Sequence, residues 1–147
     1  MLKADTEMLT GECYCGAVQY QIKGDLMRMY CCHCATCRKV TGASFSTTAV
    51  VDPALFKVTQ GEEHVVEAPQ GPHSRRHCSK CHSWVFSKSE SFPAVMFLPC
   101  GTLTNTPERD IDYHVFYSQR AKWIDVNDDK PKYPEILPEE ELAKWIP

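Results

Sequence analysis

The sequence lacks an apolar run long enough to cross a bilayer. Its longest such stretch is the short segment at residues 94–98, whereas a membrane-spanning helix needs about 20 residues. The first ten residues include two acids and no apolar centre, so we expect no secretory signal. Acidic and basic residues are interspersed and the formal net charge is only -3, which argues against a nucleic acid or a membrane as partner. These absences predict a cytoplasmic protein.

Helical patterns, internal repeats and long linkers are also scarce. Short segments in which Val, Thr, Phe and Tyr alternate with polar residues are typical of half-buried strands. We expect strands at residues 18–22, 45–51, 55–59, 83–87, 94–98 and 113–117. One helix is expected over 138–145, where a proline and three glutamates suit the first turn. The sequence thus predicts one mainly β domain over residues 1–147, with small antiparallel sheets and little helix.

Cysteine is abundant in contrast. There are nine cysteines in 147 residues, an odd number, whereas disulfide frameworks belong to oxidising compartments and prefer an even count. In a reducing cytosol the same density indicates metal ligation, and thiolates favour zinc. Short strands that bury little surface would gain stability from such a metal.

Two cysteine pairs, far apart in the sequence, could form one zinc site. The C-x-C spacing of Cys13 and Cys15 puts both sulfurs on one face of an extended strand. The C-x-x-C spacing of Cys78 and Cys81 turns both sulfurs inward around a tight loop. Four thiolates form the closed tetrahedral set typical of structural zinc. The alternative is that these residues are simply buried small apolar side chains.

A second group has five potential ligands within seven residues. If this segment enters as a strand, Cys32 and Cys34 share one face, while Cys31 and His33 point the other way. Cys37 can return to the first face through a turn. Three ligands leave a fourth position open, which is typical of catalytic zinc. The alternative is that Cys31 or His33 closes the site.

A thiol redox function competes with metal binding. Cys34 and Cys37, like Cys78 and Cys81, have the spacing of thioredoxin-like motifs. That chemistry requires the first cysteine at a helix N-terminus. We see no helical pattern beside either pair, so we expect no such helix.

Five blocks of sequence, in order and spacing, resemble the glutathione-dependent formaldehyde-activating enzyme (GFA) family, also called centromere-protein-V-like. The blocks are G-E-C-Y-C-G-A-V, C-H-C-A-T-C-R-K-V-T-G-A-S-F, R-H-C-S-K-C, C-G-T-L and H-V-F-Y-S-Q-R-A-K-W. The order and spacing typical of the family hold from residue 11 to about residue 134. The resemblance implies a β-tent fold stapled by zinc, with two Zn²⁺ per chain. It implies structural ligands at Cys13, Cys15, Cys78 and Cys81, and catalytic ligands at Cys32, Cys34 and Cys37.

The resemblance also implies an activity. The family is named for S-(hydroxymethyl)glutathione synthesis, a carbon–sulfur lyase reaction between the thiol of glutathione and an aldehyde, formaldehyde. The chain departs from the family at His82, where the family commonly has a glycine for a left-handed turn, a conformation that histidine tolerates better than most residues. Cys31 and Cys100 lie outside the family's ligand sets, and we expect Cys100 to pack in the interior.

Substrate contacts are expected near the second cysteine group. Arg38 and Lys39 could meet a carboxylate of glutathione, or they form a solvated surface pair. We expect the pocket beside the metal to be lined by Gly42, Ala43, Ser44 and Phe45, although Phe45 could equally belong to the core. His33 could transfer protons or simply pack.

The leading hypothesis is therefore a zinc-dependent enzyme that forms or breaks a carbon–sulfur bond in a small thiol adduct. The first alternative is a zinc-stabilised β scaffold that binds proteins without catalysis, since fold alone does not determine function. The second alternative is a redox sensor with a reversible disulfide between Cys34 and Cys37. A three-ligand metal site favours the enzyme, because a purely structural module gains little from an open position.

Overall fold

The computed structural model describes residues 8–145 and contains two β-sheets with little helix. One sheet has three strands in the order β1 (Met8–Glu12), β2 (Gln19–Lys23) and β5 (Phe56–Gln60). The other has seven, in the order β10 (Tyr113–Val115), β3 (Arg28–Cys32), β4 (Ser46–Val51), β9 (Met96–Pro99), β8 (Trp84–Ser89), β7 (His73–Cys78) and β6 (Val65–Gln70). The pair of β10 with β3 is parallel, and the other strand pairs are antiparallel. The predicted mainly β fold class is confirmed.

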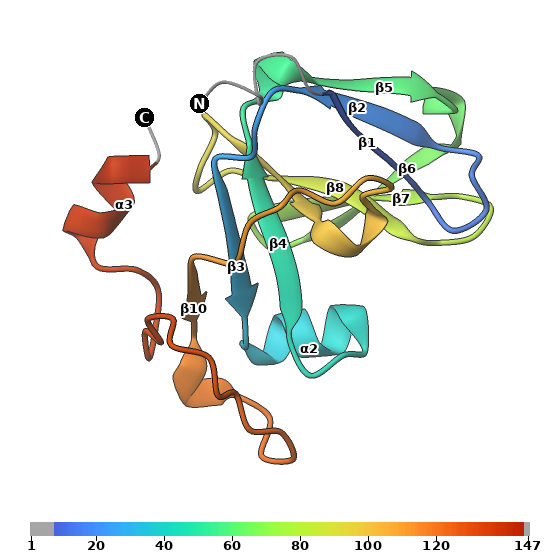
Figure 1. Cartoon of the computed structure of the whole chain (residues 1–147). Helices are drawn as coiled ribbons and strands as arrows, with labels where there is room; N and C mark the ends of the chain where they lie inside the picture. Colours follow the sequence, from blue (N-terminus) through green and yellow to red (C-terminus); the bar gives the residue numbers. More distant parts are fainter. Residues whose placement is uncertain (1–7, 146–147) are drawn as a thin grey trace.

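The main core lies between the two sheets, and Figure 1 shows the three-stranded sheet beside the β6–β8 end of the larger one. Alternation along each strand supplies its side chains: Tyr20 and Ile22 of β2 are both buried, as are Val85 of β8 and Leu98 of β9. The Tyr20 ring packs 5.3 Å from the ring of Phe56. Burial of these side chains supplies the main driving force for joining the sheets.

The six strands expected from the sequence are present, with ends that differ by at most two residues. The predicted strand at 113–117 stops at Val115 because Phe116 has a left-handed backbone (φ 53°). Strands β1, β3, β6 and β7 were not expected. β6 and β7 lack a clear apolar alternation, and β6 is an edge strand containing Pro69.

Two α-helices and four 3₁₀ turns complete the described elements. α3 (Glu139–Trp145) follows Pro138 as expected, and α2 (Ala35–Thr41) was not expected. The expectation of no helix beside Cys34 is wrong, because α2 has only seven residues and buries none of them, so it leaves no amphipathic pattern. The 3₁₀ turns are η1 (Pro53–Leu55), η2 (Glu62–His64), η3 (Cys100–Thr102) and η4 (Tyr117–Gln119). Within residues 8–145, neither α-helix has the length and hydropathy needed to traverse a bilayer.

A second, smaller apolar cluster lies where β3 ends. Beyond β10 the chain returns so that residues 131–133 lie beside β10. There the backbone N–H of His114 donates to the carbonyl of Pro131, and the N–H of Tyr133 donates to the carbonyl of His114. Figure 1 shows this segment at the β10 edge of the large sheet, and α2 where β3 ends and β4 begins. Leu137 is buried there against Cys32. The end of β3 is thus enclosed by residues that come much later in the sequence.

We predict that Gly61→Ala costs more stability than Gly71→Ala. Both glycines have a left-handed backbone (φ 82° and 64°), which costs an alanine about 1–2 kcal/mol. A Cβ atom at Gly61 would also overlap the carbonyl oxygen of Ala17, whereas a Cβ atom at Gly71 would meet nothing within 4 Å. We expect an additional loss of about 1–3 kcal/mol at Gly61, measured by urea unfolding. Equal losses in the two variants would contradict this account of the Gly61 contact.

Candidate metal centres

The first cysteine cluster joins two loops. Cys13 and Cys15 follow β1, while Cys78 ends β7 and Cys81 lies in the turn before β8. All four Sγ atoms lie within 4.8 Å of one another. The Sγ atom of Cys15 is 3.7 Å from that of Cys13 and 3.8 Å from that of Cys78. The structure therefore brings together the four cysteines that the sequence paired.

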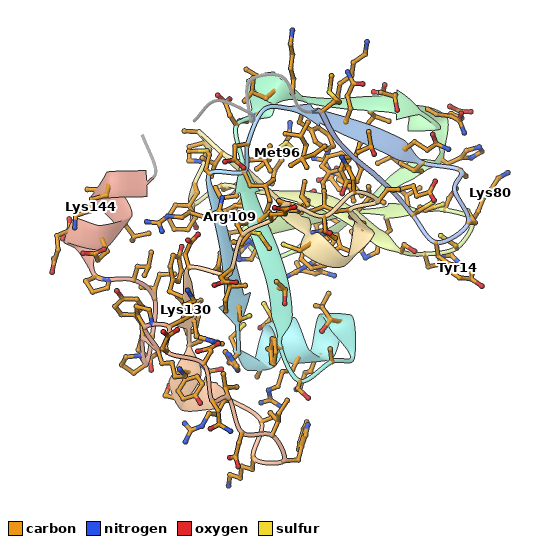
Figure 2. The ribbon with its side chains drawn as sticks, in the orientation of Figure 1. Tyr14, Lys80, Met96, Arg109, Lys130 and Lys144 are labelled. Carbon is orange, nitrogen blue, oxygen red and sulfur yellow. The ribbon has the colours of Figure 1, made fainter. Side chains whose placement is uncertain are left out.

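The route by which these sulfurs meet differs from the expected one. β1 ends at Glu12, so a turn, and not strand alternation, brings Cys13 and Cys15 together. The expectation of a left-handed residue after the second pair is confirmed, since His82 has φ 67° and its N–H donates to the carbonyl of Cys78 at 2.8 Å. Figure 2 labels Tyr14 and Lys80, whose side chains extend from the same tip of the molecule.

Hydrogen-bond donors around the first cluster favour thiolates. The N–H groups of Val18 and Lys80 donate to the sulfurs of Cys13 and Cys78 at 3.3 and 3.4 Å. Burial alone would oppose ionisation of Cys81, but the Ser83 hydroxyl and N–H more than offset it and lower the pKa of Cys81 to about 5. Four converging sulfurs with such donors fit the closed tetrahedral set of zinc.

The second cluster lies at the β3–α2 junction. Cys32 is the last residue of β3, Cys34 caps the N-terminus of α2, and Cys37 lies in the first turn of that helix. Their Sγ atoms lie within 4.8 Å of one another. The sequence reasoning chose these three cysteines on the basis of a strand followed by a turn. In the structure a helix N-cap brings Cys34 and Cys37 together, with the Cys37 N–H donating to the Cys34 sulfur at 3.3 Å.

The two other candidate ligands of this segment point elsewhere. The Sγ atom of Cys31 lies 3.7 Å from the Thr47 hydroxyl. His33 is fully buried, and its Nε2 atom lies 2.8 Å from Nδ1 of His114. Within residues 8–145, no fourth His, Cys, Asp or Glu joins the group formed by Cys32, Cys34 and Cys37.

A buried histidine pair fixes the backbone between the sulfurs. Asp128 accepts a hydrogen bond from Nε2 of His114 at 2.8 Å, and Nδ1 of His114 lies 2.8 Å from Nε2 of His33. The backbone N–H of His33 also donates to the backbone carbonyl of Val115 at 3.1 Å. Burial, and then the neighbouring His114, lower the pKa of His33 to about 4. His33 therefore anchors the loop to β10 in its neutral form.

Ionisation within the trio is unequal in the absence of a cation. The thiol of Cys32 donates to the sulfur of Cys34 at 3.5 Å, which raises the pKa of Cys32 and lowers that of Cys34. The N–H groups of Thr36 and Cys37 also lower the pKa of Cys34. A divalent cation would allow all three sulfurs to ionise, because a thiol that coordinates a metal loses its proton. The donor set thus fits zinc at this site as well.

The trio opens into a cavity of about 680 Å³. Much of its wall is apolar, with side chains of Tyr30, Phe92, Phe97, Val115, Phe116 and Ile136. Its polar lining includes Gln70, His73, Arg75, Trp84 and Ser87, which come from the β6–β7–β8 part of the sheet. Sulfur ligands and polar groups therefore face one space, an arrangement typical of small-molecule sites.

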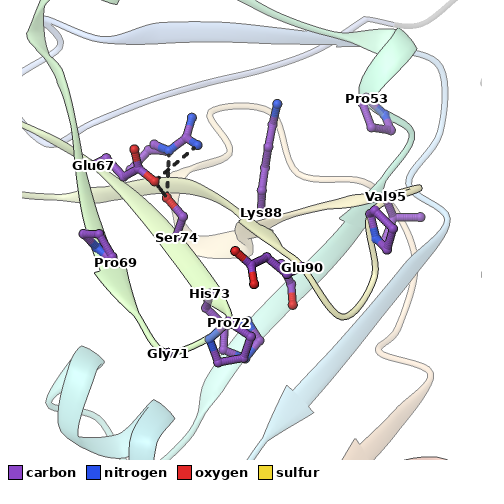
Figure 3. A pocket seen from close by; sticks show the side chains of 13 residues that line it. Pro53, Glu67, Pro69, Gly71, Pro72, His73, Ser74, Lys88, Glu90 and Val95 are labelled. Carbon is purple, nitrogen blue, oxygen red and sulfur yellow. Dashed lines mark hydrogen bonds and ion pairs between the residues drawn. The ribbon is translucent and has the colours of Figure 1, made fainter.

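A second cavity, of about 480 Å³, lies on the other face of β7. Figure 3 shows Glu67, Ser74, Lys88 and Glu90 around it. Ser74 donates a hydrogen bond to Glu67. No cysteine lines this cavity, so it is separate from both clusters.

The residues predicted to contact substrate lie beside the trio but outside its cavity. Arg38 and Lys39 are on α2, and Gly42 caps that helix. The Ser44 hydroxyl accepts a hydrogen bond from Trp123 Nε1 at 2.9 Å, and Phe45 packs 4.8 Å from the ring of His33. None of these five lines the cavity, and their contact with a substrate stays a prediction.

Sequence reasoning missed the polar wall of the cavity and the histidine anchor. Alternation along residues 73–78 places His73 and Arg75 on one face of β7. A prediction of this strand from the sequence would therefore also have placed these two side chains together. His114 and Asp128 carry no local pattern that would have paired them with His33. Their contact depends on the parallel pairing of β10 with β3.

A sequence model of the family described as "Glutathione-dependent formaldehyde-activating enzyme" matches residues 8–119, a range that contains both cysteine clusters. Among solved structures, the crystal structure of a Rhodobacter sphaeroides protein superposes with a TM-score of 0.57 at 21% sequence identity. The match covers 69% of this chain and 93% of that chain. At this identity the likeness concerns the fold alone.

We predict that Cys78→Ser abolishes one metal site and much of the stability. A structural zinc contributes about 10 kcal/mol or more to small metal-stabilised domains, and Cys78 is fully buried within the first cluster. Zinc analysis and circular dichroism should show one zinc fewer per chain and loss of the fold. Cys100→Ser is the matched control, because Cys100 belongs to neither cluster. A stable Cys78→Ser protein with unchanged zinc content would contradict the prediction.

We also predict that Asp128→Ala destabilises the protein by about 1–3 kcal/mol, because Nε2–H of the buried His114 would lose its acceptor. Asp129→Ala, at the exposed neighbouring position, should change the free energy of unfolding by less than about 0.5 kcal/mol. Urea denaturation of both variants measures the difference. If the two variants unfold at the same midpoint, the His33–His114–Asp128 chain does not stabilise the fold.

Proposed function

Because the chain belongs to the glutathione-dependent formaldehyde-activating enzyme family, we propose that it is a zinc-dependent enzyme that forms or cleaves a carbon–sulfur bond in a small thiol adduct. The observation that carries the proposal is the trio of Cys32, Cys34 and Cys37, which opens into a cavity. Within residues 8–145, no fourth side chain completes that set. Three protein ligands are typical of catalytic zinc, whereas a closed set of four is typical of structural zinc.

In this proposal one cluster holds a structural metal ion and the other holds a catalytic one. Cys13, Cys15, Cys78 and Cys81 would hold the structural ion, since they come from two loops far apart in the sequence. A hydrogen bond from Tyr14 N–H to Ser83 Oγ also joins these loops. Cys32, Cys34 and Cys37 would hold the catalytic ion. When bound there, zinc supplies a Lewis-acid position that can keep a substrate thiol ionised or polarise an aldehyde oxygen.

The reaction that fits the family is the addition of a thiol to formaldehyde. A bond forms between the thiol sulfur and the carbonyl carbon, the π electrons of the C=O bond move to oxygen, and that oxygen gains a proton as the thiol loses its own. The reverse reaction breaks the same carbon–sulfur bond. Neither direction needs an oxidant or a reductant.

The chain's own residues would prepare the site for this addition. His33 and Val115 hold the loop that carries Cys32 and Cys34, so the sulfurs need little reorganisation on binding. The apolar walls of the cavity, such as Tyr30 and Phe97, lower the local water content. Less water favours the carbonyl form of formaldehyde over its hydrate and strengthens electrostatic interactions in the site.

The test is the rate at which S-(hydroxymethyl)glutathione forms and breaks down, measured by exchange NMR with ¹³C-formaldehyde and glutathione. We expect the purified protein to contain two zinc ions per chain and to raise this rate in proportion to its concentration. Cys34→Ser should remove one zinc and all of the acceleration while the circular dichroism spectrum stays that of the parent protein. Cys31→Ser is the matched control, because Cys31 lies outside the trio and should leave the rate unchanged.

Three results would overturn the proposal. A protein with two zinc ions that leaves the rate at its protein-free value is not this enzyme. A single zinc, with the trio freely alkylated, would favour a scaffold that binds proteins. A disulfide between Cys34 and Cys37 in place of the second zinc would favour a redox sensor. Cys34 lies at the N-terminus of α2, where reactive cysteines of redox proteins are found.

A further inference from the structure

Arg75 is a buried cation without an acidic partner. Only 6% of its surface is exposed, the same fraction as for Arg28. Arg28 has Asp112 at 3.8 Å, whereas no carboxylate of the described residues lies within 4.0 Å of the Arg75 guanidinium. Burying a charge is costly unless an opposite charge compensates it. A bound anion beside Arg75 would therefore compensate the buried charge.

The surroundings of Arg75 hold it in place without neutralising it. One guanidinium nitrogen donates to Gln70 Oε1 at 2.6 Å, and the group stacks 5.2 Å from the centre of the Trp84 ring. Nε of Arg75 and Nε1 of Trp84 are both buried and find no acceptor among the described residues. The neutral contacts hold a planar guanidinium that keeps an unused N–H donor at Nε, and guanidinium is the group by which arginine recognises carboxylates.

Arg75 shares its cavity with the sulfur trio. Cys32, Cys34 and Cys37 line one part of the wall, and Arg75 lines another together with His73 and Trp84. His73 lies within electrostatic reach of both groups: after burial, Arg75 lowers the pKa of His73, and Cys34 raises it. Because both groups line this cavity of about 680 Å³, a ligand bound in it would be within the same space as the trio and the guanidinium.

We propose that Arg75 binds a carboxylate of the thiol substrate and so selects acidic thiols, such as glutathione, over neutral ones. This inference rests on the proposed function, because it assumes that the substrate sulfur sits at the trio. It assigns a specificity-determining role to a residue of β7, outside the segment of residues 38–45 where the sequence placed substrate contacts. The carboxylate supplies the charge that the buried guanidinium lacks.

Arg76 provides a matched control on the same strand. It follows Arg75 directly, so its side chain lies on the opposite face of β7 and lines the second cavity, the one shown in Figure 3. Arg76 already has an acidic partner, since its guanidinium lies 3.8 Å from Glu67. Arg76→Gln removes the same charge from the same strand without touching the cavity of the trio.

The experiment is calorimetric titration of the zinc-containing protein with three ligands. The first is glutathione, and the second is the same tripeptide with both carboxylates converted to carboxamides, which keeps its size and its thiol. The third is S-methylglutathione, which keeps both carboxylates and has no thiol. We expect the wild-type protein to bind glutathione at least about tenfold more tightly than the diamide, because loss of a buried charge pair is costly.

Variants of Arg75 and Arg76 test which residue causes the preference for glutathione over the diamide. Arg75→Gln should lose the discrimination between glutathione and the diamide, Arg75→Lys should retain part of it, and Arg76→Gln should retain all of it. Binding of S-methylglutathione should weaken at least about tenfold in Arg75→Gln. Circular dichroism and zinc content confirm that each variant is folded and loaded.

The outcomes separate this inference from the function on which it rests. Equal affinity of the wild-type protein for glutathione and the diamide overturns the role of Arg75 even if no Arg75 variant folds, and it leaves the thiol reaction standing. Discrimination that persists in Arg75→Gln, or a variant that loses zinc instead of discrimination, overturns it as well. If glutathione binds no better than S-methylglutathione, the substrate thiol does not sit at the trio. The carboxylate contact is still decided in that case, by whether Arg75→Gln weakens the binding of S-methylglutathione.

Discussion

The convergence of cysteine sulfurs into two sets, each within 4.8 Å, is the constraint on which the rest of the structure depends. Thiolates at this spacing would repel one another in a partly buried site, and a bound cation would compensate that repulsion. The loops that carry the first set lie at the tips of different hairpins, and their regular hydrogen bonds end before the sulfurs meet. A metal bound at that point would add stability that short strands gain only in part from apolar burial.

The two sets differ in what holds the backbone beneath them. In the first, the backbone turns supply N–H groups to the sulfurs of Cys13 and Cys78. In the second, the fully buried ring of His33 fastens the loop to β10, and Asp128 accepts a hydrogen bond from the intervening His114. In the proposed function, such a support would keep the three sulfurs in place while a fourth ligand is exchanged. This combination is the physical basis for assigning chemistry to the second set alone.

Much of the fold and of the ligand sets was accessible from sequence, and the remainder was not, for identifiable reasons. Alternating strands such as 18–22 and 45–51 were predictable because each buries one face. The grouping of the cysteines into sets of four and three was predictable from their C-x-C and C-x-x-C spacings, although a turn and a helix N-cap, and not strand alternation, bring the sulfurs together. α2 was missed because a seven-residue helix without a buried face carries no periodic signal. The anchor of His33 and the polar wall at Arg75 were missed because both arise from strand pairings between distant segments, which residue types alone do not encode.

The separation along the chain of the two halves of the first cluster has a consequence for biosynthesis. Cys13 and Cys15 leave the ribosome long before Cys78 and Cys81, so the emerging chain carries half a site that cannot close until β7 and the turn beyond it have been made. During that interval the early thiols are exposed to oxidants and to competing soft metals, which bind thiolates readily. The sulfurs of Cys32, Cys34 and Cys37 are adjacent in sequence and can meet as soon as α2 forms. Metal supply and the pace of translation would then decide how much of the newly made protein reaches its folded state.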